Sequence, residues 1–180
     1  MKTLTFDVET DTWNKGNPFD NRNKLICASW KINNEQAGAE QWPGIKRFIQ
    51  DAIDYCDLLV MFNGKFDYHW GHNNGLDFSG KRIWDCQVAH YILMKQRVVF
   101  PSLNDVAEFY GLAVKLDVVK TQYWEKGITT SDIPWPILQE YAVYDAELTH
   151  QVFLRQWEQA TRAQRALILL DGQDCHVLRE

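Results

Sequence analysis

Acidic side chains that could bind a metal ion occur at three separate places in the sequence. Asp7 and Glu9 stand two residues apart, Asp67 follows much later, and Asp145 comes four residues after Tyr141. Carboxylate oxygens are the ligands that Mg²⁺ prefers in proteins. A carboxylate metal site is therefore one interpretation of the sequence, provided that the fold brings the three places together.

The first place is the end of a predicted strand. Residues 3–9 alternate strictly between polar and apolar side chains, which predicts a strand with one buried face. Side chains repeat every two residues in a strand, so Asp7 and Glu9 project from the same face, roughly 7 Å apart. They could belong to a solvated face, or they could hold a cation, since neighbouring carboxylates repel one another when no cation lies between them.

The second place follows a predicted central strand. Residues 58–62 are apolar without alternation, as in strands buried on both faces. Asn63 and Asp67 lie just past the carboxyl end of this strand, which is where such sheets bind ligands. A helix over 65–74 would set the two side chains one turn apart on the same side. Taken alone, Asp67 is also typical of a helix cap.

The third place lies on a long predicted helix, residues 137–160. Tyr141 and Asp145 are four residues apart and share a face of it. Apolar residues on the same side are Leu138, Leu148 and Val152. This face therefore points inward, and an inward Asp needs a partner, which a metal ion would supply. The alternative is an ordinary core tyrosine with an aspartate at its rim.

The rest of the pattern predicts a mixed sheet flanked by helices. Asn33-Asn34 suits a tight hairpin turn, and Asp85 is expected to cap the helix that it starts. Strands are expected over 3–9, 24–32, 35–42, 58–62 and 81–84, and helices over 43–56, 65–74, 85–94, 102–110 and 137–160. Irregular helix and loop are expected over 112–130, and a further helix over 161–180.

Composition favours one folded domain. The 180 residues are 46% hydrophobic, which is enough for a full core, and no apolar run reaches the ~18 residues of a membrane helix. The four cysteines show no CxxC spacing and are expected to be reduced and mostly buried. The net charge of −5 disfavours a general polyanion binder, but it does not exclude binding of nucleic acid through cations.

Three short motifs in order give a family resemblance. Residues 6–10 (FDVET), 63–67 (NGKFD) and 141–145 (YAVYD) resemble the motifs of the DEDD-type proofreading 3′-5′ exonucleases of bacterial and phage family A DNA polymerases. Ile83-Trp84-Asp85 and Ser102-Leu103 match further landmarks, so the resemblance covers roughly residues 2–157. Tyr141 stands four residues before the last Asp, as in the tyrosine branch, DEDDy.

The resemblance implies a ribonuclease H-like α/β fold, with a five-stranded mixed sheet and helices on both faces. It further implies two divalent cations, Mg²⁺ or Mn²⁺, held by Asp7, Glu9, Asp67 and Asp145 at the 3′-terminal phosphodiester. Two such ions can clamp an in-line displacement. Tyr141 would orient the attacking water, because a phenol with an ordinary pKa of ~10 is a poor base at neutral pH.

Four further residues are expected to contact the substrate. Trp13 falls where family members have an apolar residue that wedges against the terminal bases, although it could merely pack its loop. Thr10 and Asn63 are expected to contact the terminal nucleotide or the metal-bearing loop. Lys65 could reach a phosphate or simply face water.

The expected activity is 3′-5′ exodeoxyribonuclease on the 3′ end of single-stranded or frayed DNA. An exoribonuclease of the same branch and a catalytically silent nucleic-acid-binding module are the alternatives. Residues 1–160 would form the exonuclease domain, and 161–180 a helical connector toward a family A polymerase domain, in the same chain or a separate one. No membrane association is expected, and the compartment would be the cytoplasm of a bacterial or phage-infected cell.

Overall fold

A five-stranded mixed sheet forms the centre of the computed structural model, which describes residues 1–97, 101–114 and 118–172. The strands are β1 (Thr3–Thr10), β2 (Leu25–Ile32), β3 (Gly38–Gln41), β4 (Leu58–Met61) and β5 (Arg82–Asp85). They lie in the order β3-β2-β1-β4-β5. The first three pair antiparallel, whereas β4 pairs parallel with both β1 and β5. The predicted mixed sheet is therefore correct.

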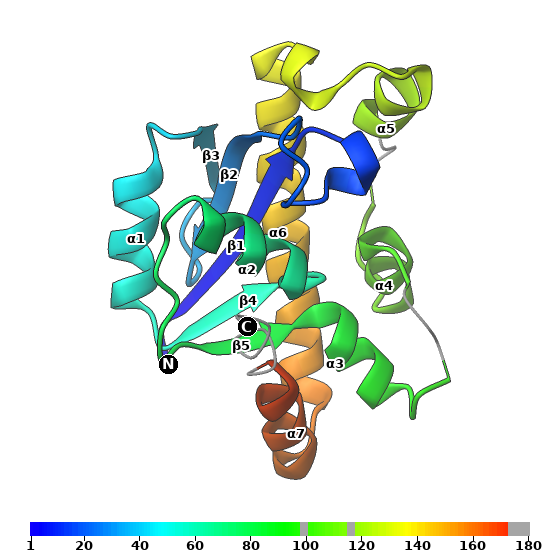
Figure 1. Cartoon of the computed structure of the whole chain (residues 1–180). Coiled ribbons are helices and arrows are strands. Elements are labelled where there is room, and N and C mark those ends of the chain that lie inside the picture. Colours follow the sequence, from blue (N-terminus) through cyan, green and yellow to red (C-terminus); the bar gives the residue numbers. More distant parts are fainter. Residues whose placement is uncertain (98–100, 115–117, 173–180) are drawn as a thin grey trace.

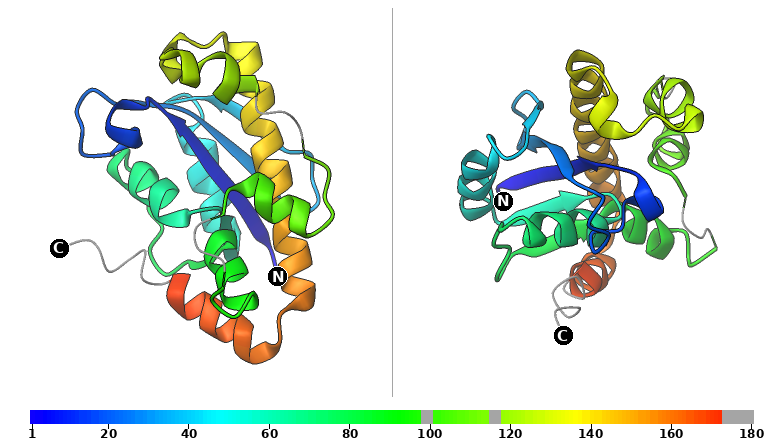
Figure 2. Two further views of the ribbon diagram at one scale, coloured as in Figure 1. Left: turned by 90° about the vertical axis from the view of Figure 1, so that its right-hand side faces the viewer. Right: turned by 45° about the horizontal axis from the view of Figure 1, so that its top comes forward.

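Helices cover both faces of this sheet (Figures 1 and 2). The long helix α6 crosses one face, and α1 and α2 lie on the other. Their bounds are α1 (Lys46–Tyr55), α2 (Gly64–Asn73), α3 (Cys86–Leu93), α4 (Leu103–Phe109), α5 (Val118–Gln122), α6 (Trp135–Gln159) and α7 (Arg162–Gly172). Short 3-10 turns are η1 (Trp13–Gly16), η2 (Trp124–Lys126) and η3 (Thr130–Asp132).

Strand β1 is buried on both faces, so the expectation of a half-buried strand is wrong. Leu4 and Phe6 pack with α1 and α2 in one core cluster. The polar side chains face α6, where Thr5 is fully buried and its Oγ1 lies 3.0 Å from Nδ1 of His150. The alternation of polar and apolar residues correctly assigns side chains to the two faces of β1. The polar face is nevertheless buried, because α6, more than a hundred residues later in the chain, covers it.

Local signals placed most of the other elements correctly. Asn33 has the positive φ, 48°, that the hairpin requires, and Ser102 and Asp105 form a reciprocal capping box at the start of α4. Residues 112–130 contain the short α5 and the 3-10 turn η2, and η3 begins at Thr130; residues 115–117 are outside the described part. Three of the four cysteines are buried and free, as expected: Cys27, Cys56 and Cys86. Cys175 lies outside the described residues.

Helix α7 folds back on the sheet beside β5 and α3. Ile168 is fully buried in the cluster that also contains Trp84 and Phe153. The backbones approach closely at Gly172, where a Cβ atom would stand 2.1 Å from the carbonyl oxygen of Ile83. The helix predicted over 161–180 is thus observed as far as Gly172, and its last eight positions are outside the described residues. Within the described ranges, no helix is both long enough and apolar enough to span a membrane.

Candidate active site

The site begins where β1 and β4 separate. Pairing between the two strands ends at Thr5 and Val60, and α2 then takes the place of β4 beside β1. The first turn of α2 carries Asp67, whose Oδ1 accepts a hydrogen bond of 3.2 Å from the backbone N–H of Val8. This contact fixes the carboxylate of Asp67 next to the residue that follows Asp7.

Asp67 is a buried carboxylate with an unpaired oxygen. It is only 1% exposed, and its Oδ2 has no hydrogen-bond partner among the described residues. Burial raises the pKa of Asp67 well above its ordinary value, and the nearby charge of Asp7 raises it further. Burial also raises the pKa of Asp7 to about 7, although Oγ of Ser29, at 3.5 Å, donates to it and opposes that shift. Two carboxylates so close, with one oxygen unsatisfied, suit a bound cation.

Asp85 holds the turn from which α2 starts. As predicted, it caps α3, with Oδ1 accepting from the N–H groups of Gln87 at 2.8 Å and Val88 at 3.3 Å. It also accepts from Asn63 at 3.2 Å and from Gly64 at 2.7 Å, both at the start of α2. Sequence reasoning missed this second role, because the two N–H groups belong to a turn 21 and 22 residues earlier in the chain.

Tyr141 and Asp145 lie on α6 and line one cavity of about 350 Å³. The opposite wall comes from the start of α4, with Asn104, and from α5, with Val118. The ring of Tyr141 packs edge-on against Trp124, with centroids 5.6 Å apart. Tyrosine and aspartate therefore share one side of α6, as their spacing predicts, and this side faces a space large enough for a ligand.

The acids form two parts rather than one ready-made cluster. Asp7 and Asp67 are close, whereas Tyr141 and Asp145 share the cavity on α6. Glu9, on the same face of β1 as Asp7, is 8% exposed. Across residues 1–97, 101–114 and 118–172, no three His, Cys, Asp or Glu side chains are arranged to hold a metal ion. A site made by all four acids therefore remains a prediction, while the pair Asp7 and Asp67 fits a cation.

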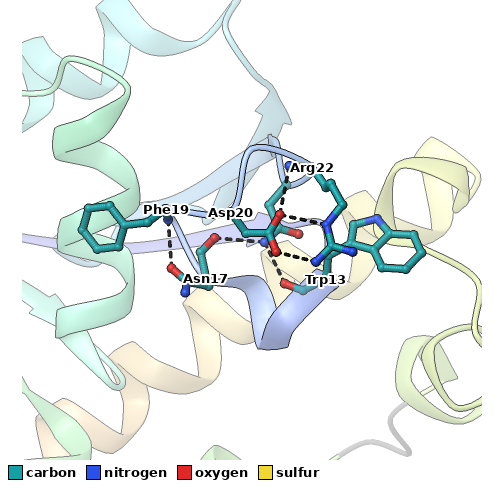
Figure 3. Close-up of polar contacts among 6 residues, drawn as sticks. Trp13, Asn17, Phe19, Asp20 and Arg22 are labelled. Atoms are coloured by element: carbon teal, nitrogen blue, oxygen red, sulfur yellow. Dashed lines mark hydrogen bonds and ion pairs between the residues drawn. The ribbon is translucent and has the colours of Figure 1, made fainter.

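The loop after β1 presents two exposed rings on opposite sides (Figure 3). Trp13 is 51% exposed, and the guanidinium of Arg22 lies 5.2 Å from its ring centre. Arg22 is in turn paired with Asp20 at 2.6 Å. Phe19 points the other way, toward His69 on α2. Trp13 thus packs with Arg22 and still exposes half of its surface, so both interpretations of its role remain open.

The other predicted substrate contacts differ in accessibility. Asn63 and Lys65 are exposed at the start of α2, with Asn63 in the left-handed conformation at φ 60°. Thr10 is buried, and its hydroxyl donates to the carbonyl of Asp11 at 3.1 Å. The structure thus gives Thr10 a contact within the loop, while substrate contact by these residues remains a prediction.

The sheet order, with helices on both faces, defines a ribonuclease H-like α/β domain. The family model described as 3′-5′ exonuclease matches residues 2–159, so this chain belongs to that family. A DNA polymerase I from Treponema pallidum (strain Nichols) is 30% identical over 96 residues, which are 53% of this chain and 9% of that relative. The chain therefore matches only a small part of the polymerase's length.

Solved structures agree on the fold at low identity. One described as the apo form of a nuclease has a TM-score of 0.62 at 14% identity, over 97% of this chain and 79% of that one. The family B DNA polymerase from the archaeon Pyrobaculum calidifontis has a TM-score of 0.58 at 17% identity, over 96% of this chain and 29% of the polymerase. The predicted fold class and family are confirmed.

Proposed function

We propose that this chain is a metal-dependent 3′-5′ exodeoxyribonuclease of the DEDDy type. The observation that supports it most is the pairing of the buried Asp67 with the partly buried Asp7, in which Oδ2 of Asp67 has no partner among the described residues. A buried unsatisfied oxygen beside a second carboxylate costs stability unless a ligand satisfies it. Membership of the 3′-5′ exonuclease family supplies the reaction class.

Asp7 and Asp67 would hold a divalent cation, Mg²⁺ or Mn²⁺, and Glu9 and Asp145 would complete a site for two. Bound ions would supply Lewis-acid activation of water and stabilisation of the leaving oxygen. The protein contributes the position of each carboxylate. The N–H of Val8 fixes one oxygen of Asp67 and leaves Oδ2 directed away from that bond. The charge that β1 and α2 bring together is what attracts the cations.

Tyr141 would orient the water that attacks the terminal phosphodiester. Its ring is fixed against Trp124 and lines the same cavity as Asp145. A phenol positioned in this way can accept or donate a hydrogen bond without losing its proton. Positioning, rather than proton abstraction, is therefore the role that its chemistry favours.

The substrate would be the 3′ end of single-stranded or frayed DNA. Trp13 offers an exposed indole at the end of β1, and stacking on an aromatic ring contributes ~1–3 kcal/mol per base without regard to sequence. Asn63 and Lys65, exposed at the start of α2, would contact the terminal nucleotide and a phosphate. Thr10 would act through the loop that its hydroxyl steadies.

The domain boundary belongs to the same proposal. Residues 1–160 would be the exonuclease unit, and 161–180 a connector toward a polymerase domain in the same or a separate chain, in the cytoplasm of a bacterial or phage-infected cell. None of the four acids lies in the connector. Because Ile168 packs in the core cluster, a chain ending at Ala160 should be less stable and still cleave.

The test is a 5′-labelled DNA oligonucleotide incubated with Mg²⁺, with and without a chelator, beside a matched RNA oligonucleotide. A ladder that shortens by one nucleotide at a time from the 3′ end, and that needs the metal, is the expected result. Faster degradation of the RNA would replace DNA by RNA as the substrate. An intact oligonucleotide in a folded, metal-supplied protein would leave a catalytically silent binding module.

A further inference from the structure

Asp85 links the starts of two helices, and one of them carries Asp67. Its carboxylate is 6% exposed and receives four backbone N–H groups: two from α3, and two from Asn63 and Gly64 at the start of α2. Charge-assisted hydrogen bonds of this kind are stronger than neutral ones. One side chain at the end of β5 therefore fixes α2 relative to α3.

Helix α2 has no cap of its own. Asn63, the residue before it, is in the left-handed conformation at φ 60°, and its side chain makes no capping hydrogen bond. The first N–H groups of a helix need partners from outside the helix. Asp85 accepts from the first of them, the N–H of Gly64 at 2.7 Å, and from the N–H of Asn63 just before the helix. A Cβ atom at Gly64 would stand 3.2 Å from Cβ of Met61 and 3.4 Å from Oδ2 of Asp85, so a side chain there would leave little room.

The same helical turn carries both contacts. Gly64 hydrogen-bonds Asp85, and Asp67, three residues later, accepts from the N–H of Val8 on β1. A shift of the start of α2 would therefore move the carboxylate of Asp67 relative to Asp7. We propose that Asp85 is a positioning residue, which holds the first turn of α2 so that Asp67 stays in register with β1 and can bind the catalytic cation.

This inference rests on the proposed function, because it concerns the binding of a cation by Asp67. The informative variant is Asp85→Ser. Serine is as good an N-cap as aspartate and can keep the cap of α3, but its shorter side chain cannot also reach Asn63 and Gly64. Asp105→Ser is the matched control, since Asp105 also accepts a backbone N–H, that of Ser102 at 2.9 Å, at the start of another helix.

Two measurements are needed. The first is the amide signal of Val8 in ¹H–¹⁵N spectra of the metal-free protein, which reports the hydrogen bond to Asp67. The second is the dissociation constant for Mn²⁺ from calorimetry. In Asp85→Ser we expect the Val8 signal to shift and its hydrogen exchange to speed up, and the Mn²⁺ affinity to fall by about 10-fold or more, as for other residues that orient metal ligands. Asp105→Ser should change neither.

A wild-type Mn²⁺ affinity in Asp85→Ser would overturn the proposal, and so would an unchanged Val8 signal. If Asp85→Ser fails to fold, Asp85→Asn takes its place, because the amide nitrogen in the position of Oδ2 cannot accept the hydrogen bond from Gly64. Failure of the proposed function looks different. A wild-type protein that binds no Mn²⁺ would overturn that function, and the Val8 signal alone would then decide whether Asp85 positions Asp67.

Discussion

Asp67 and Asp85 are both buried near the first turn of α2, but their hydrogen bonding is opposite. The four backbone N–H groups around Asp85 lower its pKa against the effect of burial, which still raises it. Asp67 receives one such group, from Val8, and its other oxygen has no partner among the described residues. A satisfied buried carboxylate stabilises a fold, whereas an unsatisfied one beside a second acid indicates a ligand.

The largest effect is expected for Asp67→Asn. Asparagine keeps the oxygen that accepts from Val8 but replaces the unpaired Oδ2 by an amide nitrogen, which cannot bind a cation. Cleavage of a labelled oligonucleotide should fall to background, a loss of at least about 10³-fold, on the scale of groups that act at the reacting atoms. Cleavage within tenfold of wild type would show that Asp67 is not a metal ligand.

Substitutions of the two aspartates should also differ in their effect on the stability of the protein. Metal-free Asp67→Asn should melt at or above the wild-type temperature, because asparagine removes a carboxyl group whose raised pKa costs stability at neutral pH. Asp85→Ala should lose about 2 kcal/mol, or roughly 4–8 °C in Tm, since buried N–H groups at two helix starts lose their acceptor. Calorimetry on both variants measures the difference. Equal losses would mean that both carboxylates are only structural.

His150 carries another buried atom, Nε2, that has no partner among the described residues, and it tests whether such atoms always mark function. Burial, and then the charge of Lys31, lowers the pKa of His150 to about 4. The unfolded chain therefore binds more protons between pH 4 and 6.5, so stability should rise with pH across that window and be lost as pH falls through it.

The expected contribution of His150 is at most about 3 kcal/mol. His150→Asn should flatten the difference in unfolding free energy between pH 4 and 6.5, measured in urea. Its cleavage rate at pH 8 should match that of wild type, because His150 packs against Thr5 rather than an acid of the site. Parallel pH profiles would contradict the neutral, buried state of this histidine.

Among the residues of the proposed site, Tyr141→Phe should cause the smallest loss of cleavage. The four acids remain, and the variant loses only the hydroxyl for which we propose the role of orienting water. Groups positioned to transfer a proton typically contribute ~10²–10⁴-fold to a rate. The cleavage rate should fall by less than the lower of these two values. Rates from a single-turnover assay on one oligonucleotide measure this directly. An unchanged rate would leave Tyr141 as a packing partner of Trp124.

Features set by neighbouring residues could be predicted from the sequence. The run of four apolar residues in β4, the Ser102 cap and the cap of α3 by Asp85 are all local signals. The spacing of Tyr141 and Asp145 likewise predicts that they share a face of the helix, and both line one cavity. These features depend only on the periodicity of side chains along a helix or strand and on the need of the first N–H groups of a helix for acceptors.

Features set by distant segments could not be predicted in this way. The second buried face of β1 depends on α6, and the second pair of hydrogen bonds to Asp85 depends on the turn at Asn63. Oδ2 of Asp67, which has no partner among the described residues, likewise takes its surroundings from the assembled sheet and helix. A sequence shows which residue types could carry chemistry. Whether their polar atoms have hydrogen-bond partners can be seen only in the fold.

The central claim is that Asp7 and Asp67 bind a divalent cation. Calorimetric titration of Mn²⁺ into wild type and Asp67→Asn, at neutral pH and without nucleic acid, tests it most directly. We expect saturable binding to wild type, with proton release from the two carboxyl groups, and at least about tenfold weaker binding to Asp67→Asn. Equal Mn²⁺ affinity in the two proteins would contradict it.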